Sequence, residues 1–79
     1  SSPGPLAQAI CLRVETGSTM RRVASDLAAR GAVASPVIFR IGSDYSGRTP
    51  ELKAGSYLVP EGASMEEIAD LVTRGGAST

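Results

Sequence analysis

The carboxylate side chains are the residues of this chain that could do acid–base chemistry. Enzymes that cleave sugar polymers use one or two carboxylates held in a partly desolvated cleft. Here Glu15, Glu51 and Glu61 fall in or beside expected turns. Glu66 and Glu67 fit the first turn of a helix, where acids favour the positive end of the helix dipole. The sequence therefore predicts solvated or capping carboxylates, and no residue is assigned as catalytic.

Histidine and cysteine add no further chemistry. The 79 residues include no histidine and one cysteine, Cys11, which excludes the usual nucleophilic triads, a zinc site and an intrachain disulfide. The sequence contains neither a G-x-G-x-x-G motif nor a phosphate-binding loop, and no cofactor or metal is expected. No lysine adjoins Cys11 to activate the thiol, so we expect it to act as a small apolar side chain.

Two adjacent arginines, Arg21 and Arg22, stand near the expected start of the first helix. Cations at that end oppose the helix dipole by roughly 0.3 kcal/mol each. Two interpretations stay open. The arginines are exposed and paired with Glu15 or Asp26, or they form an anion site at the helix N-terminus.

The elements that would position these residues begin with two expected strands. Residues 10–14 alternate between apolar and other side chains, the period of a strand with one buried face. Residues 57–59 are strand formers bounded by Gly55 and Pro60. Neither strand could cover its own edges. We therefore expect an α+β fold in which the two strands pair as an antiparallel sheet beneath helices.

The first helix is expected to begin at Thr19 and to end at Arg30 and Gly31, a suitable dipole partner and a left-handed cap. Its apolar residues recur with helical spacing and predict a core-facing stripe of Met20, Val23, Ala24, Leu27 and Ala28.

The second and third helices carry their own start signals. Ser35 and Pro36 begin the second, whose apolar surface consists of Ile38, Ile41 and Tyr45, widened by Val37 and Phe39. Residues 46–51 are expected to form a loop. Ser64 and Glu67 form a capping box for the third helix. That helix presents Met65, Ile68, Ala69 and Val72 and is expected to end at Arg74, Gly75 and Gly76.

Length and charge limit the class of protein. A chain of 79 residues holds one small domain, and no run approaches the roughly 20 apolar residues of a membrane span. Eight Lys/Arg balance eight Asp/Glu without a like-charge block, which argues against nucleic acid or an anionic membrane surface as the main partner.

Two segments carry a family resemblance. V-E-T-G-S-T-M-R-R-V-A at 14–24 and L-K-A-G-S-Y-L-V-P at 52–60 resemble the lysin motif (LysM). With S-P-V-I-F-R in the middle and V-P-E-G-A-S-M-E-E-I at the end, the chain is similar to the LysM-like region of the endolytic murein transglycosylases, the MltG or YceG-like family. The resemblance covers about residues 6–76.

The resemblance implies a LysM-like strand–helix–helix–strand core at 9–60 and an additional helix at 61–76. Residues 1–8 would form a linker or N-terminal arm, and 77–79 a tail. Lysin motifs bind N-acetylglucosamine-containing glycans, such as peptidoglycan, through the turn after the first strand and the loop before the second. The corresponding candidate glycan contacts are Gly17, Ser18, Thr19, Met20 and Arg21, together with Leu52, Lys53, Ala54 and Gly55.

The resemblance also implies the setting of a parent protein. Family members are periplasmic proteins with one N-terminal anchor in the bacterial inner membrane, and they cleave nascent glycan strands non-hydrolytically. Their catalytic glutamate lies in a domain downstream of this region, so this fragment is expected to be non-catalytic. Its expected partners are a glycan strand, bound weakly, and that downstream domain.

Two other functions remain open at this point. The domain could be a packing or docking module, in which apolar faces of the second or third helix seat against the catalytic domain without binding sugar. A KH-like RNA-binding core has the same element order, but the chain lacks a G-x-x-G loop between the helices and has no basic surplus.

Overall fold

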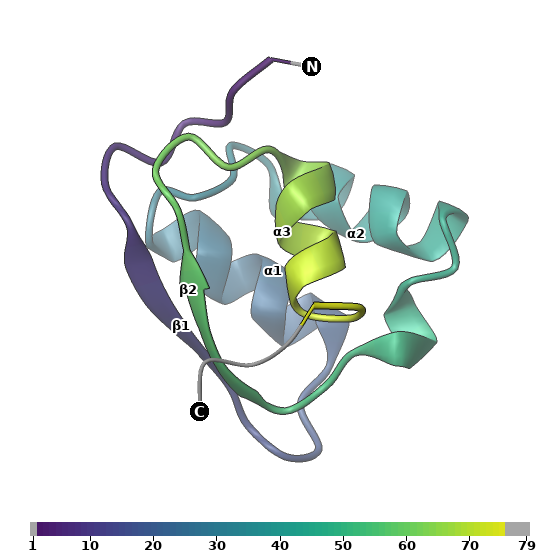
Figure 1. The fold of residues 1–79 in the computed structure, drawn as a ribbon. Coiled ribbons are helices and arrows are strands. Elements are labelled where there is room, and N and C mark those ends of the chain that lie inside the picture. The colour runs from purple at the N-terminus through teal and green to yellow at the C-terminus, as the bar shows by residue number, and fades with distance from the viewer. Residues whose placement is uncertain (1, 76–79) are drawn as a thin grey trace.

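The computed structural model describes residues 2–75 (Figure 1). Its elements follow the chain in the order β1 (Ile10–Val14), α1 (Met20–Ala29), α2 (Pro36–Tyr45), η1 (Thr49–Glu51), β2 (Gly55–Val59) and α3 (Met65–Leu71). This order confirms the predicted α+β fold. The short 3-10 turn η1 stands where a loop was expected. It contains Pro50, whose fixed backbone angle suits a helical turn.

The sheet consists of β1 and β2, which pair antiparallel as predicted. The register places Ile10 opposite Val59 and Val14 opposite Gly55. Side chains alternate across it, so Leu12, Val14, Tyr57 and Val59 are buried whereas Cys11, Arg13 and Leu58 are exposed. Because Val14 and Gly55 are partners, the turn after β1 and the segment before β2 lie at the same end of the sheet (Figure 1).

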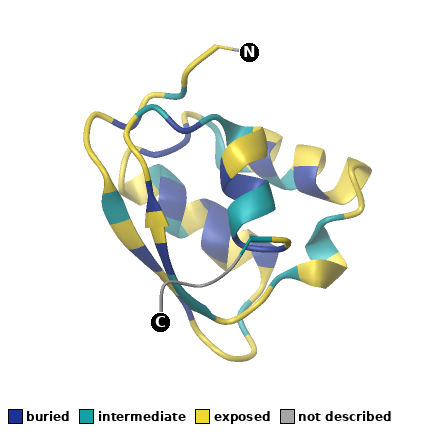
Figure 2. Ribbon diagram, viewed as in Figure 1, coloured by how far each residue is buried: buried dark blue, intermediate teal, exposed yellow. Residues whose placement is uncertain are grey.

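The core fills the space between the sheet and the helices (Figure 2). In α1 the buried residues are Met20, Val23, Ala24 and Leu27, as the helical spacing predicted, and Ala28, the fifth predicted residue, is partly buried against the core. Thr19 is the N-cap, and Gly31 follows the helix with φ +76°, which glycine adopts without strain. Within residues 2–75, no helix is long and apolar enough to cross a membrane.

The buried side of α2 differs from its most apolar side. Phe39 and Ser43 face the core, and the Ser43 hydroxyl donates to the Phe39 carbonyl at 2.9 Å, which satisfies its polar atom. Ile38 and Ile41 remain 60% and 61% exposed, and Tyr45 is 95% exposed. α2 packs against both α1 and α3, so the side of α2 that is buried depends on where these helices lie and not only on its own apolar spacing.

The N-terminal arm packs against the turn between β2 and α3. Leu6 is buried, the Gly4 N–H donates to the Gly62 carbonyl at 2.7 Å, and the Gly62 N–H donates to the Leu6 carbonyl at 2.9 Å. A Cβ atom on Gly4 would lie 2.1 Å from the Ala63 carbonyl oxygen, so only glycine fits. The arm therefore contributes to the same core as the elements it precedes.

The start of α3 contains the predicted capping box. The Glu67 N–H donates to the Ser64 hydroxyl at 3.1 Å, and the Ser64 N–H donates to the Glu67 carboxylate at 2.8 Å. The helix ends at Leu71 and continues as a turn through Arg74, slightly earlier than expected. Gly76, part of the predicted end, lies outside the described residues.

Replacing Ser64 with alanine is expected to lower the free energy of unfolding by about 1 kcal/mol, because one helix N–H loses its acceptor. Urea unfolding followed by circular dichroism measures the change. Ser25→Ala, at an exposed position of α1, is the control and should be neutral or slightly stabilising. Equal midpoints for the two variants would contradict a stabilising role for the cap.

Candidate functional site

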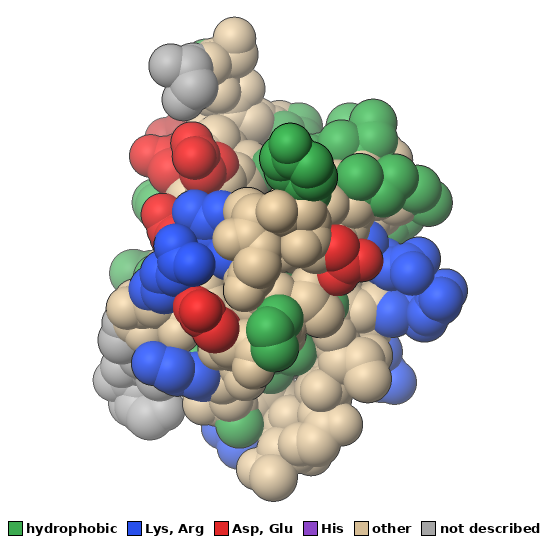
Figure 3. All heavy atoms as spheres, turned by 90° about the vertical axis from the view of Figure 1, so that its right-hand side faces the viewer, with side chains coloured by type: hydrophobic (Ala, Val, Ile, Leu, Met, Phe, Trp, Pro, Cys, Tyr) green, Lys and Arg blue, Asp and Glu red, His purple; other side chains and the backbone are tan. Residues whose placement is uncertain are grey.

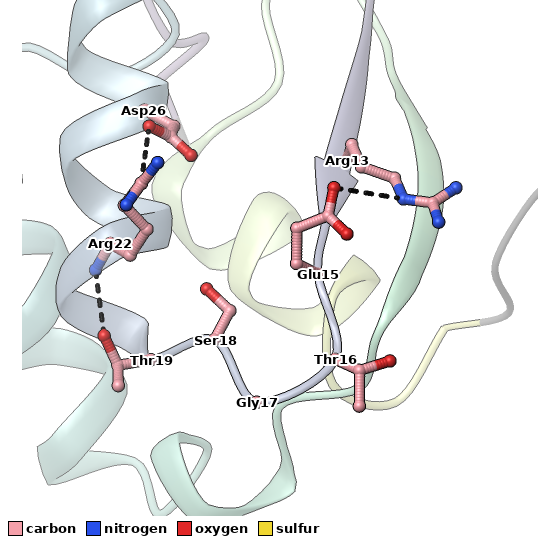
Figure 4. A pocket seen from close by; sticks show the side chains of 8 residues that line it. All are labelled: Arg13, Glu15, Thr16, Gly17, Ser18, Thr19, Arg22 and Asp26. Carbon is pink, nitrogen blue, oxygen red and sulfur yellow. Dashed lines mark hydrogen bonds and ion pairs between the residues drawn. The ribbon is translucent and has the colours of Figure 1, made fainter.

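An open hollow of about 460 Å³ lies at the corner between β1 and α1 (Figure 4). We call it the β1–α1 corner. Its lining residues come from the end of β1, the following turn and the first two turns of α1: Arg13, Glu15, Thr16, Gly17, Ser18, Thr19, Arg22 and Asp26. The Ser18 side chain points up between the two arms of the corner in this view.

Local hydrogen bonds fix the backbone of this corner. The Ser18 N–H donates to the Glu15 carbonyl at 3.0 Å, and Gly17 has φ +82°, the left-handed conformation that the turn requires. The Thr19 hydroxyl accepts from the Arg22 N–H at 3.2 Å and caps α1. The Thr19 hydroxyl therefore caps the helix, whereas the Ser18 hydroxyl makes no hydrogen bond within residues 2–75 and can contact a ligand.

Two weak ion pairs flank the hollow (Figure 4). Arg13 lies 3.6 Å from Glu15, and Arg22 lies 3.5 Å from Asp26, and all four side chains are substantially exposed. Exposed pairs of this kind contribute about 0–1 kcal/mol, so their donors and acceptors can exchange partners. Of the two interpretations of Arg21 and Arg22, the geometry gives Arg22 a pairing with Asp26.

The segment before β2 lies at the same end of the sheet, but its backbone is already hydrogen-bonded. The Lys53 N–H donates to the Val72 carbonyl at 3.0 Å, and the Lys53 carbonyl accepts from the Tyr57 hydroxyl at 2.7 Å. Burial raises the pKa of Tyr57 above its ordinary value, so the phenol stays protonated as this donor. A ligand at Lys53 would therefore meet the side chain of this residue, because both of its backbone groups are already hydrogen-bonded.

Ion pairs between side chains also join the end of α3 to the segment before β2. The Arg48 guanidinium donates to Asp70 at 2.9 and 2.7 Å, and Arg74 lies 2.9 Å from Glu51. Together with the Lys53 hydrogen bond, these contacts tie the last turn of α3 to the chain between α2 and β2. The end of α3 thus fixes the position of the segment before β2.

The predicted contact residues fall into separate environments. Gly17, Ser18 and Thr19 line the β1–α1 corner. The Met20 side chain is buried in the core, and Arg21 is exposed on α1 outside the lining of the hollow. Across the sheet end, Leu52 packs partly against the core, Lys53 and Ala54 are exposed, and Gly55 is the first residue of β2.

Sequence reasoning did not assign Arg13, Glu15, Thr16 or Asp26 as ligand contacts, and it named Arg22 either as part of an anion site or as an ion-pair partner of Glu15 or Asp26. Two signals could have found some of them. Outward alternation along β1 places Arg13 on the exposed face, and the i,i+4 spacing of Arg22 and Asp26 places both on one side of α1.

The side chains of the corner are suited to hydrogen bonding. The carboxylates of Glu15 and Asp26 keep 74% and 44% of their side-chain surface exposed, unlike a general acid in a desolvated cleft. Among residues 2–75, no cluster of metal-ligating side chains is present. Phe39 and Tyr57 are buried, and Tyr45 is on α2, so no aromatic ring lines the corner to stack on a sugar.

A second surface feature is the apolar outer side of α2, which we call the α2 face. It consists of Val37, Ile38, Ile41 and Tyr45, each more than half exposed. Apolar side chains gather in the upper part of the surface in Figure 3. Beside them a groove of about 280 Å³ runs between α2 and α3, lined by Ile38, Phe39, Gly42, Ser43, Ser46, Arg48, Met65, Glu66 and Ala69.

The strand–helix–helix–strand core, its two-stranded sheet and the third helix define a LysM-like α+β domain. Comparison with known proteins identifies the family. The chain belongs to the YceG-like family, whose model matches residues 12–79. This membership supports a role related to the cell wall.

A solved structure has the same fold. The 2.6 Å crystal structure of a YceG-like protein from Listeria monocytogenes matches 91% of this chain with a TM-score of 0.81 and 21% sequence identity. The match covers only 23% of the Listeria chain, so this domain corresponds to a minor part of that protein. No curated protein matches the chain.

Proposed function

We propose that the domain is a non-catalytic module that positions a peptidoglycan glycan strand at the β1–α1 corner for a catalytic domain of the same polypeptide. The supporting observation is the polar hollow there, in a chain of a cell-wall-related family. The parent would be a lytic transglycosylase at the periplasmic face of the bacterial inner membrane. The domain would supply orientation rather than chemistry.

The geometry favours weak binding. An open site without an aromatic platform relies on hydrogen bonds, and each contributes about 1 kcal/mol net because water competes. Three or four such bonds give about 4 kcal/mol, which corresponds to a Kd of about 1 mM. A weak contact suits a module that holds a strand for processing and then releases it.

NMR titration of the 79-residue chain with an N-acetylglucosamine oligomer and with a muramic-acid-containing oligomer tests this proposal. Amide shifts are expected at residues 16–22, with smaller shifts at 53–56. Preference for the second oligomer would indicate that Arg13 or Arg22 contacts its carboxylate. A spectrum unchanged at about 10 mM of either oligomer, roughly ten times the expected Kd, would reject glycan binding by the domain.

Replacing Ser18 with alanine should weaken glycan binding about three- to tenfold, the equivalent of one hydrogen bond. The Ser18 side chain makes no hydrogen bond within the described residues, so the unfolding midpoint should stay unchanged. Ser25→Ala, on α1 outside the hollow, should leave the affinity unaltered. Equal affinities of the Ser18 variant and the wild type would remove Ser18 from the binding site.

The α2 face favours a second candidate function, a docking module that supports the catalytic domain without binding sugar. Four large apolar side chains lie side by side in solvent on one helix, and such patches commonly mark interaction surfaces. The bonded Lys53 backbone also reduces what the second loop can offer a glycan. The two functions are compatible, because the β1–α1 corner and the groove beside the α2 face share no lining residue.

A further inference from the structure

We propose that the groove between α2 and α3 receives a bulky apolar side chain from the larger remainder of the same polypeptide, and that Gly42 keeps the groove open for it. This inference rests on the docking function above. It assigns the contact to one position of the α2 face and predicts that a single added side chain blocks it.

Gly42 is the first observation that supports this inference. It lies in the interior of α2, where glycine costs about 0.5–1 kcal/mol relative to alanine. A Cβ atom at Gly42 would meet no atom within 4 Å, so packing within the domain does not require glycine. Gly42 instead forms part of the groove lining between Ile38 and Ser46, where a side chain would project into the open space.

The groove has the composition of a receptor for an apolar group. Phe39, Ala69 and Met65 are among its lining residues, and Ile38 belongs both to this lining and to the α2 face. Its volume of about 280 Å³ is larger than a leucine or phenylalanine side chain and much smaller than a whole helix. We therefore expect one inserted side chain with flat apolar contacts around it.

The size of the patch favours an occupant from the same polypeptide over a second copy. A ten-residue helix is about 15 Å long, and one side of it offers far less than the roughly 800 Å² that each partner gives to a stable interface. A covalent connection removes this requirement, because it raises the effective concentration to the millimolar range. The match covers 23% of the Listeria chain, so the larger part of that protein lies outside the matched domain.

Hydrogen exchange measured by mass spectrometry tests the inference on the full polypeptide encoded by the gene and on the 79-residue chain. Peptides covering residues 37–45 are expected to exchange at least tenfold more slowly in the full polypeptide. Gly42→Leu should return them to the rate of the 79-residue chain, and Ile38→Ser, which trims the groove wall, should do so partly. Ser25→Leu, exposed on α1, is the matched control and should keep the protection.

Each outcome decides between the two levels of the proposal. If the protection persists in the Gly42→Leu variant, no side chain inserts into the groove, but docking of the α2 face is still supported. Equal exchange in the full and 79-residue chains overturns both, and protection that appears in the 79-residue chain only at high concentration assigns the face to a second copy and overturns the inference. In the 79-residue chain, Gly42→Leu should unfold at the wild-type temperature or above, and Gly42→Ala above it, since the added Cβ has free space.

Discussion

Replacing Phe39 with alanine is expected to lower the free energy of unfolding by about 3–5 kcal/mol. The ring is 2% exposed and packs among the core residues, so the truncation leaves a cavity. Domains of this size have a total stability of roughly 4–12 kcal/mol, so the variant should lose about a quarter of it or more. Thermal unfolding followed by circular dichroism should show a fall of about 12–40 °C in Tm.

Ile41→Ala is the matched control, because it removes an apolar side chain from the same helix. Ile41 is 61% exposed, so the change should be within about 0.5 kcal/mol. The comparison tests which side of α2 the core selects. A larger loss for Ile41→Ala than for Phe39→Ala would mean that the helix is rotated relative to the structure.

Asp70→Ala is expected to destabilise the chain by about 2–3 kcal/mol, the second largest effect. The Arg48 side chain is only 12% exposed, and both of its hydrogen bonds to a carboxylate go to Asp70. Removing the acid leaves a largely buried guanidinium without its partner, which costs more than losing an exposed pair. Urea unfolding of the variant measures the change, with an unaltered m-value expected.

A double-mutant cycle with Arg48→Met separates the pair from its surroundings. Removing both partners should be less costly than the sum of the single changes, because the double variant buries no lone charge. The exposed Arg22–Asp26 pair is the control, and its coupling should be about 0.5 kcal/mol or less. Additive effects at Arg48 and Asp70 would show that the contact does not tie α3 to the loop before β2.

The parts of the fold that follow local rules could be predicted from the sequence. Thr19, Ser35 and Ser64 each cap the helix that they were expected to start, because a hydroxyl before a helix satisfies a nearby N–H. The alternation of side chains in residues 10–14 predicted which face of β1 is buried, because successive side chains of a strand point to opposite faces.

Features that depend on distant contacts were not predictable in this way. The apolar spacing of α2 did not predict that Ser43 would be buried, because that depends on how α1 packs against the helix. The hydrogen bond from Lys53 to Val72 joins residues that no local pattern relates. The same limit applies to the β1–α1 corner, where family resemblance suggested Ser18 but the fold added Arg13 and Asp26.

The pairing of β1 with β2 has a consequence for how the chain folds. The hydrogen bond between Arg13 and Ser56 joins residues 43 positions apart, and closing such a loop costs roughly 3 kcal/mol of chain entropy. The α1–α2 pair forms from nearer contacts and should assemble first, leaving the sheet to close late. Refolding at high protein concentration should therefore favour aggregation through unpaired strand edges, and refolding at low protein concentration should raise the yield of native protein.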